Sequence, residues 1–106
     1  MIKRRSKYSV GGHAYEFDDF EVVHKGETYL TSGNLYIEFE AKFSDGEWVI
    51  DWIPEGINDL LVYNDDGDFP DIANDRMFRV NLTRLVSSKY EDDIELELIS
   101  KVESDE

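Results

Sequence analysis

Apolar and polar residues alternate most regularly in the middle of the chain. Over 35–43 the apolar side chains take every odd position, and from Trp48 to Trp52 they take every even one. A period of two is typical of strands with one buried face. Asp45-Gly46, between them, is typical of a two-residue hairpin turn. This turn pairs Phe43 with Trp48, Ala41 with Ile50, and Phe39 with Trp52. All six residues fall on one face, so we predict a hairpin of 35–43 with 47–53.

Two more dipeptides extend this pattern towards the N-terminus. A turn at Lys25-Gly26 would fold 19–24 onto 27–31, and a turn at Ser32-Gly33 would fold 27–31 onto 35–43. The resulting meander pairs Val22 with Tyr29, Val23 with Thr28, Tyr29 with Tyr36 and Leu30 with Leu35. A short strand at 14–17 adds an edge. Another, at 57–63, follows the break at Pro54-Glu55-Gly56.

The spacing of apolar residues changes after residue 74. Phe78, Leu82, Leu85 and Val86 follow a helical period, and Tyr90, Ile94, Leu98 and Val102 recur every four residues. Asn74 is an expected N-cap, and Ser88 to Glu91 has the form of a capping box. We predict helices over 74–86 and 89–102. The alternative is a second hairpin, because 78–82 and 94–98 also alternate.

The predicted fold class is therefore α+β, an antiparallel four- to five-stranded β-meander followed by two C-terminal helices. An all-β fold with a C-terminal hairpin is the alternative. The chain of 106 residues is long enough for one domain with its own core. We expect a basic, flexible N-terminus at 1–7 and a single acidic globular domain at 8–106.

Charge is the strongest feature of the composition. The chain has 25 acidic residues and 11 Lys and Arg, for a net charge of −14. Four of these cations lie in the first seven residues, so the body from Tyr8 onward carries about −18. A body this acidic repels nucleic acid and anionic membranes. It suits a partner protein with a basic surface.

Motifs for enzyme chemistry are absent from the sequence. There is no cysteine, and His13 and His24 lack the spacing of a metal site. No nucleophile motif or phosphate-binding loop is present, so we expect no enzyme, no cofactor and no metal. The loop 64–71 suggests calcium as a weaker alternative, but its glycine does not match an EF-hand. With no apolar run long enough to span a bilayer, we expect a cytoplasmic protein.

The predicted hairpin brings several acids together on its polar face. Glu40 lies opposite Asp51, and Glu38 lies two residues away on the same face, beside Tyr29 and Tyr36. Like charges directly opposite each other cost stability, so the cluster suits a cationic partner. The alternative is a solvated sheet face, or one that Lys42 and a helix arginine neutralise. We predict that the partner-binding residues are Tyr29, Tyr36, Glu38, Glu40, Asp51 and the loop acids Asp65, Asp66 and Asp68. A homo-oligomeric structural or assembly module, pairing through the row of Val22, Tyr29 and Tyr36, is the alternative.

In size, acidity and freedom from cysteine, the chain resembles small phage-encoded inhibitors of host nucleases and defence systems. These include DNA-mimic anti-restriction and anti-CRISPR proteins. The resemblance lies in overall composition and involves no motif. It implies an inhibitor in the host cytoplasm that occupies the nucleic-acid-binding surface of a host nuclease or DNA-binding protein. A compact domain of this length is roughly 34 Å across. A duplex of that length carries about 20 phosphates, close to the charge of the body.

Overall fold

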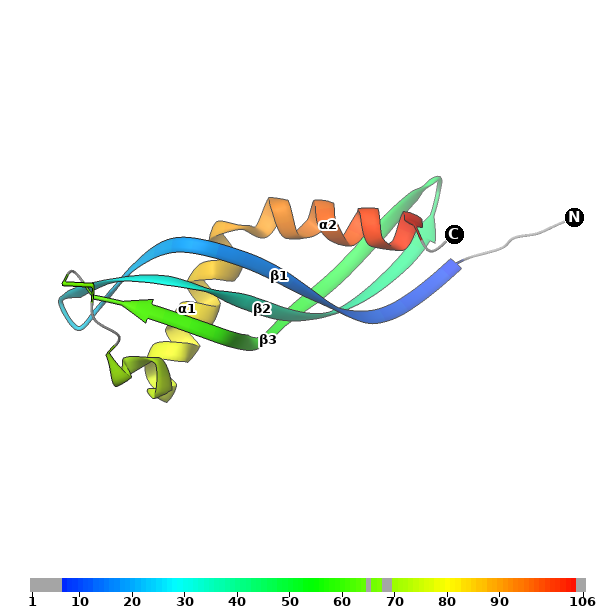
Figure 1. Ribbon diagram of the computed structural model, residues 1–106. Coiled ribbons are helices and arrows are strands. Elements are labelled where there is room, and N and C mark those ends of the chain that lie inside the picture. Colours follow the sequence, from blue (N-terminus) through cyan, green and yellow to red (C-terminus); the bar gives the residue numbers. More distant parts are fainter. Residues whose placement is uncertain (1–6, 65, 68–69, 105–106) are drawn as a thin grey trace, which may run out of the picture.

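The computed structural model describes residues 7–64, 66–67 and 70–104 and shows a three-stranded sheet with two helices (Figure 1). The strands pair antiparallel in the order β1-β2-β3. The α+β class, the meander and the two C-terminal helices are confirmed. The four- to five-strand count is wrong, and so is the all-β alternative. The elements are β1 (Lys7–His24), β2 (Glu27–Ser44), β3 (Glu47–Tyr63), a 3₁₀ turn η1 (Asp71–Asn74), α1 (Arg76–Lys89) and α2 (Glu91–Ser104).

Two of the three predicted turns are confirmed. Lys25 and Gly26 have φ values of 52° and 82°, and Asp45 and Gly46 have 53° and 86°. Two successive positive φ values define a type I′ turn, whose twist matches that of the flanking strands. The predicted pairs across both turns are present, including Phe39 with Trp52 and Glu40 with Asp51.

Ser32-Gly33 is not a turn, because β2 runs straight through it. Leu35 pairs with Tyr15 on one side and Ile57 on the other, and not with Leu30. The predicted strands at 14–17 and 19–24 are therefore two parts of β1. Those at 47–53 and 57–63 are likewise two parts of β3.

The polar residues around Gly33 support a bulge on each side of β2. The pairing with β1 shifts between Phe17 and Phe20, and the pairing with β3 shifts between Ser32 and Asn34. The extra segments contain Asp19 (φ 52°) and Asp59 (φ 54°). The Asp19 N–H donates to Ser32 Oγ at 3.2 Å, and Asn34 Nδ2 donates to Asp59 Oδ2 at 3.3 Å. Ser32 and Asn34 thus hold the bulges, which accounts for a turn-like sequence inside a strand.

The straight path of β2 also corrects the predicted faces of 19–31. Val22 and Tyr29 are buried, whereas Val23 and Leu30 are exposed. A turn at Ser32-Gly33 would have put Leu30 opposite Leu35 on one face. In a continuous strand, two residues that are an odd number of positions apart, such as Leu30 and Leu35, point to opposite faces. The buried positions of β2 are Tyr29, Thr31, Leu35, Ile37, Phe39 and Ala41.

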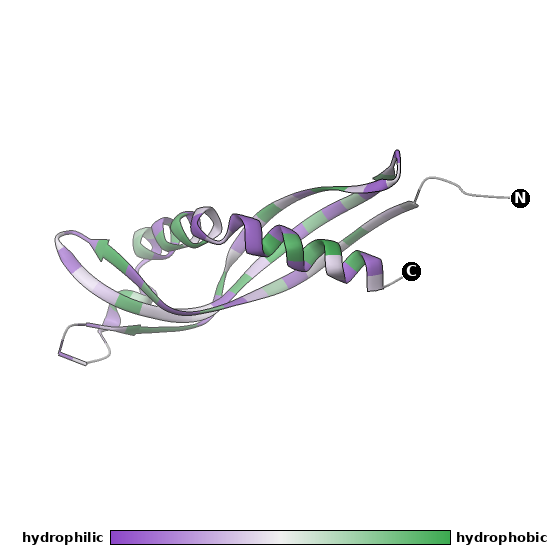
Figure 2. Ribbon diagram, turned by 90° about the horizontal axis from the view of Figure 1, so that it is seen from above, coloured by the Kyte–Doolittle hydropathy of each residue, from purple (hydrophilic) through white to green (hydrophobic). Residues whose placement is uncertain are grey.

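The helices cover one face of the sheet and follow one another along its length (Figures 1 and 2). Each contributes a buried apolar stripe to the core, Phe78, Leu82 and Val86 from α1 and Ile94, Leu98 and Val102 from α2. Both helices begin two residues later than predicted. The N-cap of α1 is Asp75, not Asn74, and Ser88 belongs to α1, so the predicted capping box does not start α2.

Replacing Asp75 by alanine should weaken the start of α1. Asp75 Oδ1 accepts a hydrogen bond from the Phe78 N–H at 3.0 Å, and this bond lowers the pKa of the carboxyl below its usual 3.8. The stabilisation is present above the ordinary pKa and is lost as the pH falls through the lowered value. We expect the melting temperature at neutral pH to fall by about 3–8 °C. Asp75→Asn keeps the acceptor and should change little. An equal loss in both variants would contradict a capping role.

The molecule is much longer than a compact domain of its size. Its extents are 63 × 20 × 19 Å and its radius of gyration is 17.0 Å. Strands of 17 and 18 residues explain the length, because a strand rises about 3.3 Å per residue. The compact shape assumed in the comparison with a DNA duplex is therefore wrong.

Candidate protein interface on the open face of the sheet

The face of the sheet opposite the helices, here called the open face, carries most of the exposed apolar side chains. Eleven large apolar side chains are exposed among the described residues. The strand register places eight of them on this face. They are Tyr8, Val10, Val23, Leu30, Tyr36, Val49, Ile53 and Leu61. Apolar surface gathered on one face is typical of an interaction site.

Three neighbouring carboxylates form a cluster among these apolar side chains, with Lys42 two residues from one of them on the same face. One cross-strand row contains Val10, Glu40 and Asp51, and an adjacent row contains Gly12, Glu38 and Ile53. Within the described part of the chain, no ion pair involves Glu38, Glu40 or Asp51. Glu40 and Asp51 are directly opposite each other, an arrangement that destabilises a sheet. A cationic partner would remove that repulsion.

Tyr8 orients one of these carboxylates. Its hydroxyl donates to Glu40 Oε1 at 2.5 Å from the adjacent strand β1. This hydrogen bond to an anion raises the pKa of Tyr8, with smaller contributions from burial and from the Glu40 charge. The bond uses Oε1 of Glu40, so the second carboxylate oxygen is not needed for the contact with Tyr8.

The three carboxylates line a shallow hollow of about 550 Å³ on the open face, together with Val10, Phe39, Trp52 and Ile53. Val10 and Ile53 form apolar parts of its lining, and Glu38, Glu40 and Asp51 supply the charge. Gly12 has no side chain to fill the surface beside the hollow. A Cβ added there would meet only the Ile37 carbonyl oxygen, at 3.7 Å. The hollow can therefore contact the aliphatic part and the charged end of one basic side chain.

The predicted site residues divide into three groups. Tyr36, Glu38, Glu40 and Asp51 lie together on the open face, as predicted. Tyr29 does not, because it is buried against Phe78 on the helix side, where its hydroxyl donates to Glu27 Oε2 at 2.9 Å. Its predicted pairing with Tyr36 followed from the false turn at Ser32-Gly33.

The loop acids are not part of this cluster. Asp66 follows β3, and its N–H donates to Asn64 Oδ1 at 3.0 Å. It lines a separate hollow with Gly26, Glu27 and Thr28. Thr28 is about 40 Å along β2 from Glu40, at the rise of an extended strand. Asp65 and Asp68 lie outside the described residues.

Several residues of the interface were absent from the predicted set. Val49 and Ile53 alternate with the core residues Trp48, Ile50 and Trp52, so the hairpin pattern could have placed them beside Asp51. Tyr8 and Val10 had no such signal. Their position depends on β1 extending to Lys7 and pairing with the far end of β2.

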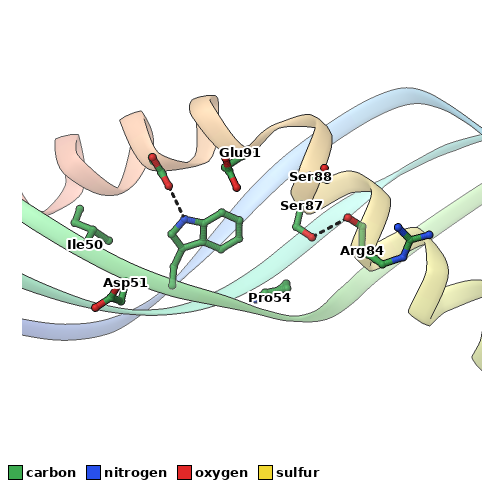
Figure 3. Close-up of a pocket in the computed structure, with 9 residues that line it drawn as sticks. Ile50, Asp51, Pro54, Arg84, Ser87, Ser88 and Glu91 are labelled. Carbon is green, nitrogen blue, oxygen red and sulfur yellow. Dashed lines mark hydrogen bonds between the residues drawn. The ribbon is translucent and has the colours of Figure 1, made fainter.

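A second hollow, here called the cleft, lies on the helix side of β3 and has a volume of about 450 Å³ (Figure 3). Trp52 Nε1 donates to Glu95 Oε2 at 3.3 Å across it. Arg84 Nη2 is held by Asn81 Oδ1 at 2.8 Å. The lining residues are Ile50, Asp51, Trp52, Pro54, Arg84, Ser87, Ser88, Glu91 and Glu95.

Neither a metal centre nor a membrane-spanning helix is found among the described residues. No three His, Asp or Glu side chains there are grouped to hold an ion. The candidate calcium loop includes Asp65 and Asp68, which lie outside that part of the chain. No described helix is long and apolar enough to cross a bilayer. Comparisons with protein-family models, curated proteins and solved structures found no match for this chain.

Proposed function

We propose that this chain is a non-enzymatic binding protein that inhibits a partner by occupying a basic, nucleic-acid-binding surface of that partner. The observation that carries this proposal is the composition of the open face. Glu38, Glu40 and Asp51 have no ion pair among the described residues, and exposed apolar side chains surround them. Apolar contacts would supply affinity, and the carboxylates would supply orientation and partner choice.

Local charge supports the proposal better than total charge does. A duplex as long as this molecule, 63 Å, would carry about 37 phosphates. The body carries about −18, roughly half that number. The chain therefore does not reproduce the charge density of DNA over its length. The acidic cluster between Val10 and Ile53 is a smaller and partly apolar feature, suited to basic side chains of a protein.

A second copy of the chain fits the open face less well than a basic partner. Stacking two open faces would bring Glu38, Glu40 and Asp51 of both copies close together, three carboxylates in each copy against Lys42 as the nearby cation. Like charges buried in an interface oppose association. Light scattering should therefore find a monomer at low salt, and a stable dimer under those conditions would contradict this.

Neutralising the open face should abolish capture of the partner. We expect immobilised protein to retain a basic host protein at low salt and to release it steeply as salt rises. The triple variant Glu38→Gln, Glu40→Gln and Asp51→Asn should bind that protein at least about tenfold more weakly. Gel-shift or nuclease assays of the captured protein would then report inhibition by the wild-type chain.

The matched control removes three exposed carboxylates elsewhere, with Asp71→Asn, Asp92→Asn and Glu103→Gln. It has the same net charge as the triple variant and should bind like the wild type. Equal loss of binding in both variants would show that only total charge matters. Affinity that is independent of salt would exclude an electrostatic partner altogether.

A further inference from the structure

The outer edge of β3 lies between the two hollows described above. β3 pairs with β2 alone among the described strands, so its other edge is unpaired there. Asp51 and Trp52 line both the hollow on the open face and the cleft. Figure 3 shows Ile50 on the helix side of β3 and Asp51 on the opposite side. A strand added to this edge would direct successive side chains alternately into the two hollows.

The hairpin register identifies the free backbone groups of this edge. The type I′ turn at Asp45-Gly46 joins Ser44 and Glu47 as a hydrogen-bonded pair. Hydrogen-bonded and non-hydrogen-bonded pairs then alternate along an antiparallel ladder. Trp48, Ile50 and Trp52 are therefore the residues whose N–H and C=O groups point away from β2.

The adjoining part of the same edge, from Pro54 to Ile57, is protected. Pro54 has no N–H, and a bulge follows it between Tyr36 and Ile37 in the pairing with β2. Beyond the bulge, Arg79 Nη1 from α1 donates to the Ile57 carbonyl oxygen at 2.8 Å. Proline, bulges and covering side chains are the usual means of blocking an edge. The described structure shows no such cover over 48–52, so this part is available.

From this geometry we infer that the partner adds an extended basic segment to the edge of β3 at 48–52. The inference rests on the proposed function and specifies how the partner docks. Basic side chains of the segment would enter the open-face hollow, which contains Glu38, Glu40 and Asp51 and no cation. The intervening side chains would face the cleft, whose lining is mixed in charge, with Arg84 beside Glu91 and Glu95 and the apolar surface of Trp52 and Pro54. Backbone hydrogen bonds would give affinity, and the hollows would select alternate residues.

Charge also excludes a second copy of this chain, the simplest competing occupant of the β3 edge. In a dimer formed through two β3 edges, each copy would present Glu47 and Asp51 to the acidic hollow of the other.

The outer edge of β1 is a poorer acceptor for the segment. The hollow on its helix side contains Lys101, and the His13 Nε2 in it is 2.7 Å from Glu97 Oε1.

The test uses a seven-residue peptide in which arginine and threonine alternate, and two N-methylated forms of it. We assign the segment an antiparallel direction, in which two residues that exchange hydrogen bonds are directly opposite and share a face. The residues that bond to Trp48, Ile50 and Trp52 then face the cleft, and these are the threonines. N-methylation of the threonines should weaken binding to the full chain at least about tenfold. N-methylation of the arginines removes N–H groups that point to solvent and should leave the affinity unchanged. Fluorescence anisotropy gives the dissociation constants.

Hydrogen exchange supplies a second readout. Peptide binding should slow exchange of the Ile50 and Trp52 amides, whereas the Val49 and Asp51 amides already bond to β2. Equal binding of the two N-methylated peptides would overturn strand addition and leave the proposed electrostatic function intact. Failure of the unmethylated peptide to bind, when the basic partner does bind, would also overturn it. Slow exchange of Ile50 and Trp52 that depends on protein concentration would instead place a second copy on this edge.

Discussion

Replacing Phe78 by alanine is expected to lower the free energy of unfolding by about 3–5 kcal/mol. Phe78 is fully buried and lies at the centre of the contact between α1 and the sheet. Its ring meets the rings of Tyr29 and His24 edge to face, with centroids 5.6 and 5.3 Å apart. Removing it leaves a cavity next to two aromatic rings that cannot easily move into it. Chemical denaturation followed by tryptophan fluorescence would measure the loss.

Met77 provides the matched control for this substitution. It precedes Phe78 in the same turn of α1, but it is 66% exposed. Met77→Ala should change the free energy of unfolding by less than about 0.5 kcal/mol. If both variants lose stability equally, the effect does not arise from the burial of Phe78, because alanine favours the helix at both positions. If neither does, α1 is not anchored to the sheet as described.

Substitution of Gly33 by valine is expected to cost about 2–3 kcal/mol. A Cβ at this position would be 3.1 Å from Ile57 Cγ2, 3.2 Å from the Asn58 carbonyl oxygen and 3.4 Å from Leu60 Cα. Two of these three atoms belong to the backbone of β3, which the bulge brings close to β2. The strand would have to separate from its neighbour, so the bulge is the reason for the glycine. Denaturation curves at neutral pH would measure the effect.

Gly12 is the control, because it is also a strand glycine but faces open space. A Cβ there would meet only the Ile37 carbonyl oxygen, at 3.7 Å. Gly12→Val should leave stability unchanged or raise it by about 0.5–1 kcal/mol, since valine restricts the unfolded chain and favours strands. A stable Gly33→Val variant would show that residues 32–34 form a turn or loop after all.

Short-range sequence patterns predicted the structure correctly wherever residues close together in the chain determine it. The Asp45-Gly46 turn and the alternation on either side of it determine the pairing of Glu40 with Asp51, and hence the centre of the candidate interface. The four-residue spacing of Ile94, Leu98 and Val102 was sufficient for α2. In both regions the spacing identifies the side that packs against the core, with Ile94, Leu98 and Val102 buried and Trp48, Ile50 and Trp52 partly buried.

The same rules failed at Ser32-Gly33-Asn34 because turns and bulges use the same residues. Glycine was needed there for close packing against β3. Ser32 was needed to accept from the Asp19 N–H of β1, and Asn34 to donate to the Asp59 side chain of β3. The sequence of one strand does not show where the strands that pair with it will form bulges. The error then assigned Tyr29 to the open face, because a false turn reverses the face of every residue before it.

The sequence by itself determined the acidity, the α+β class, two of the hairpin turns and the opposition of Glu40 and Asp51. Only the tertiary structure decided that three long strands form one extended sheet, since this depends on pairings between distant residues. It also placed Tyr8 and Val10 beside the carboxylates and left the 48–52 edge of β3 between two hollows. These features arise where β1, β3 and the helices meet, and contacts between segments far apart in the chain leave no periodic pattern in any one of them.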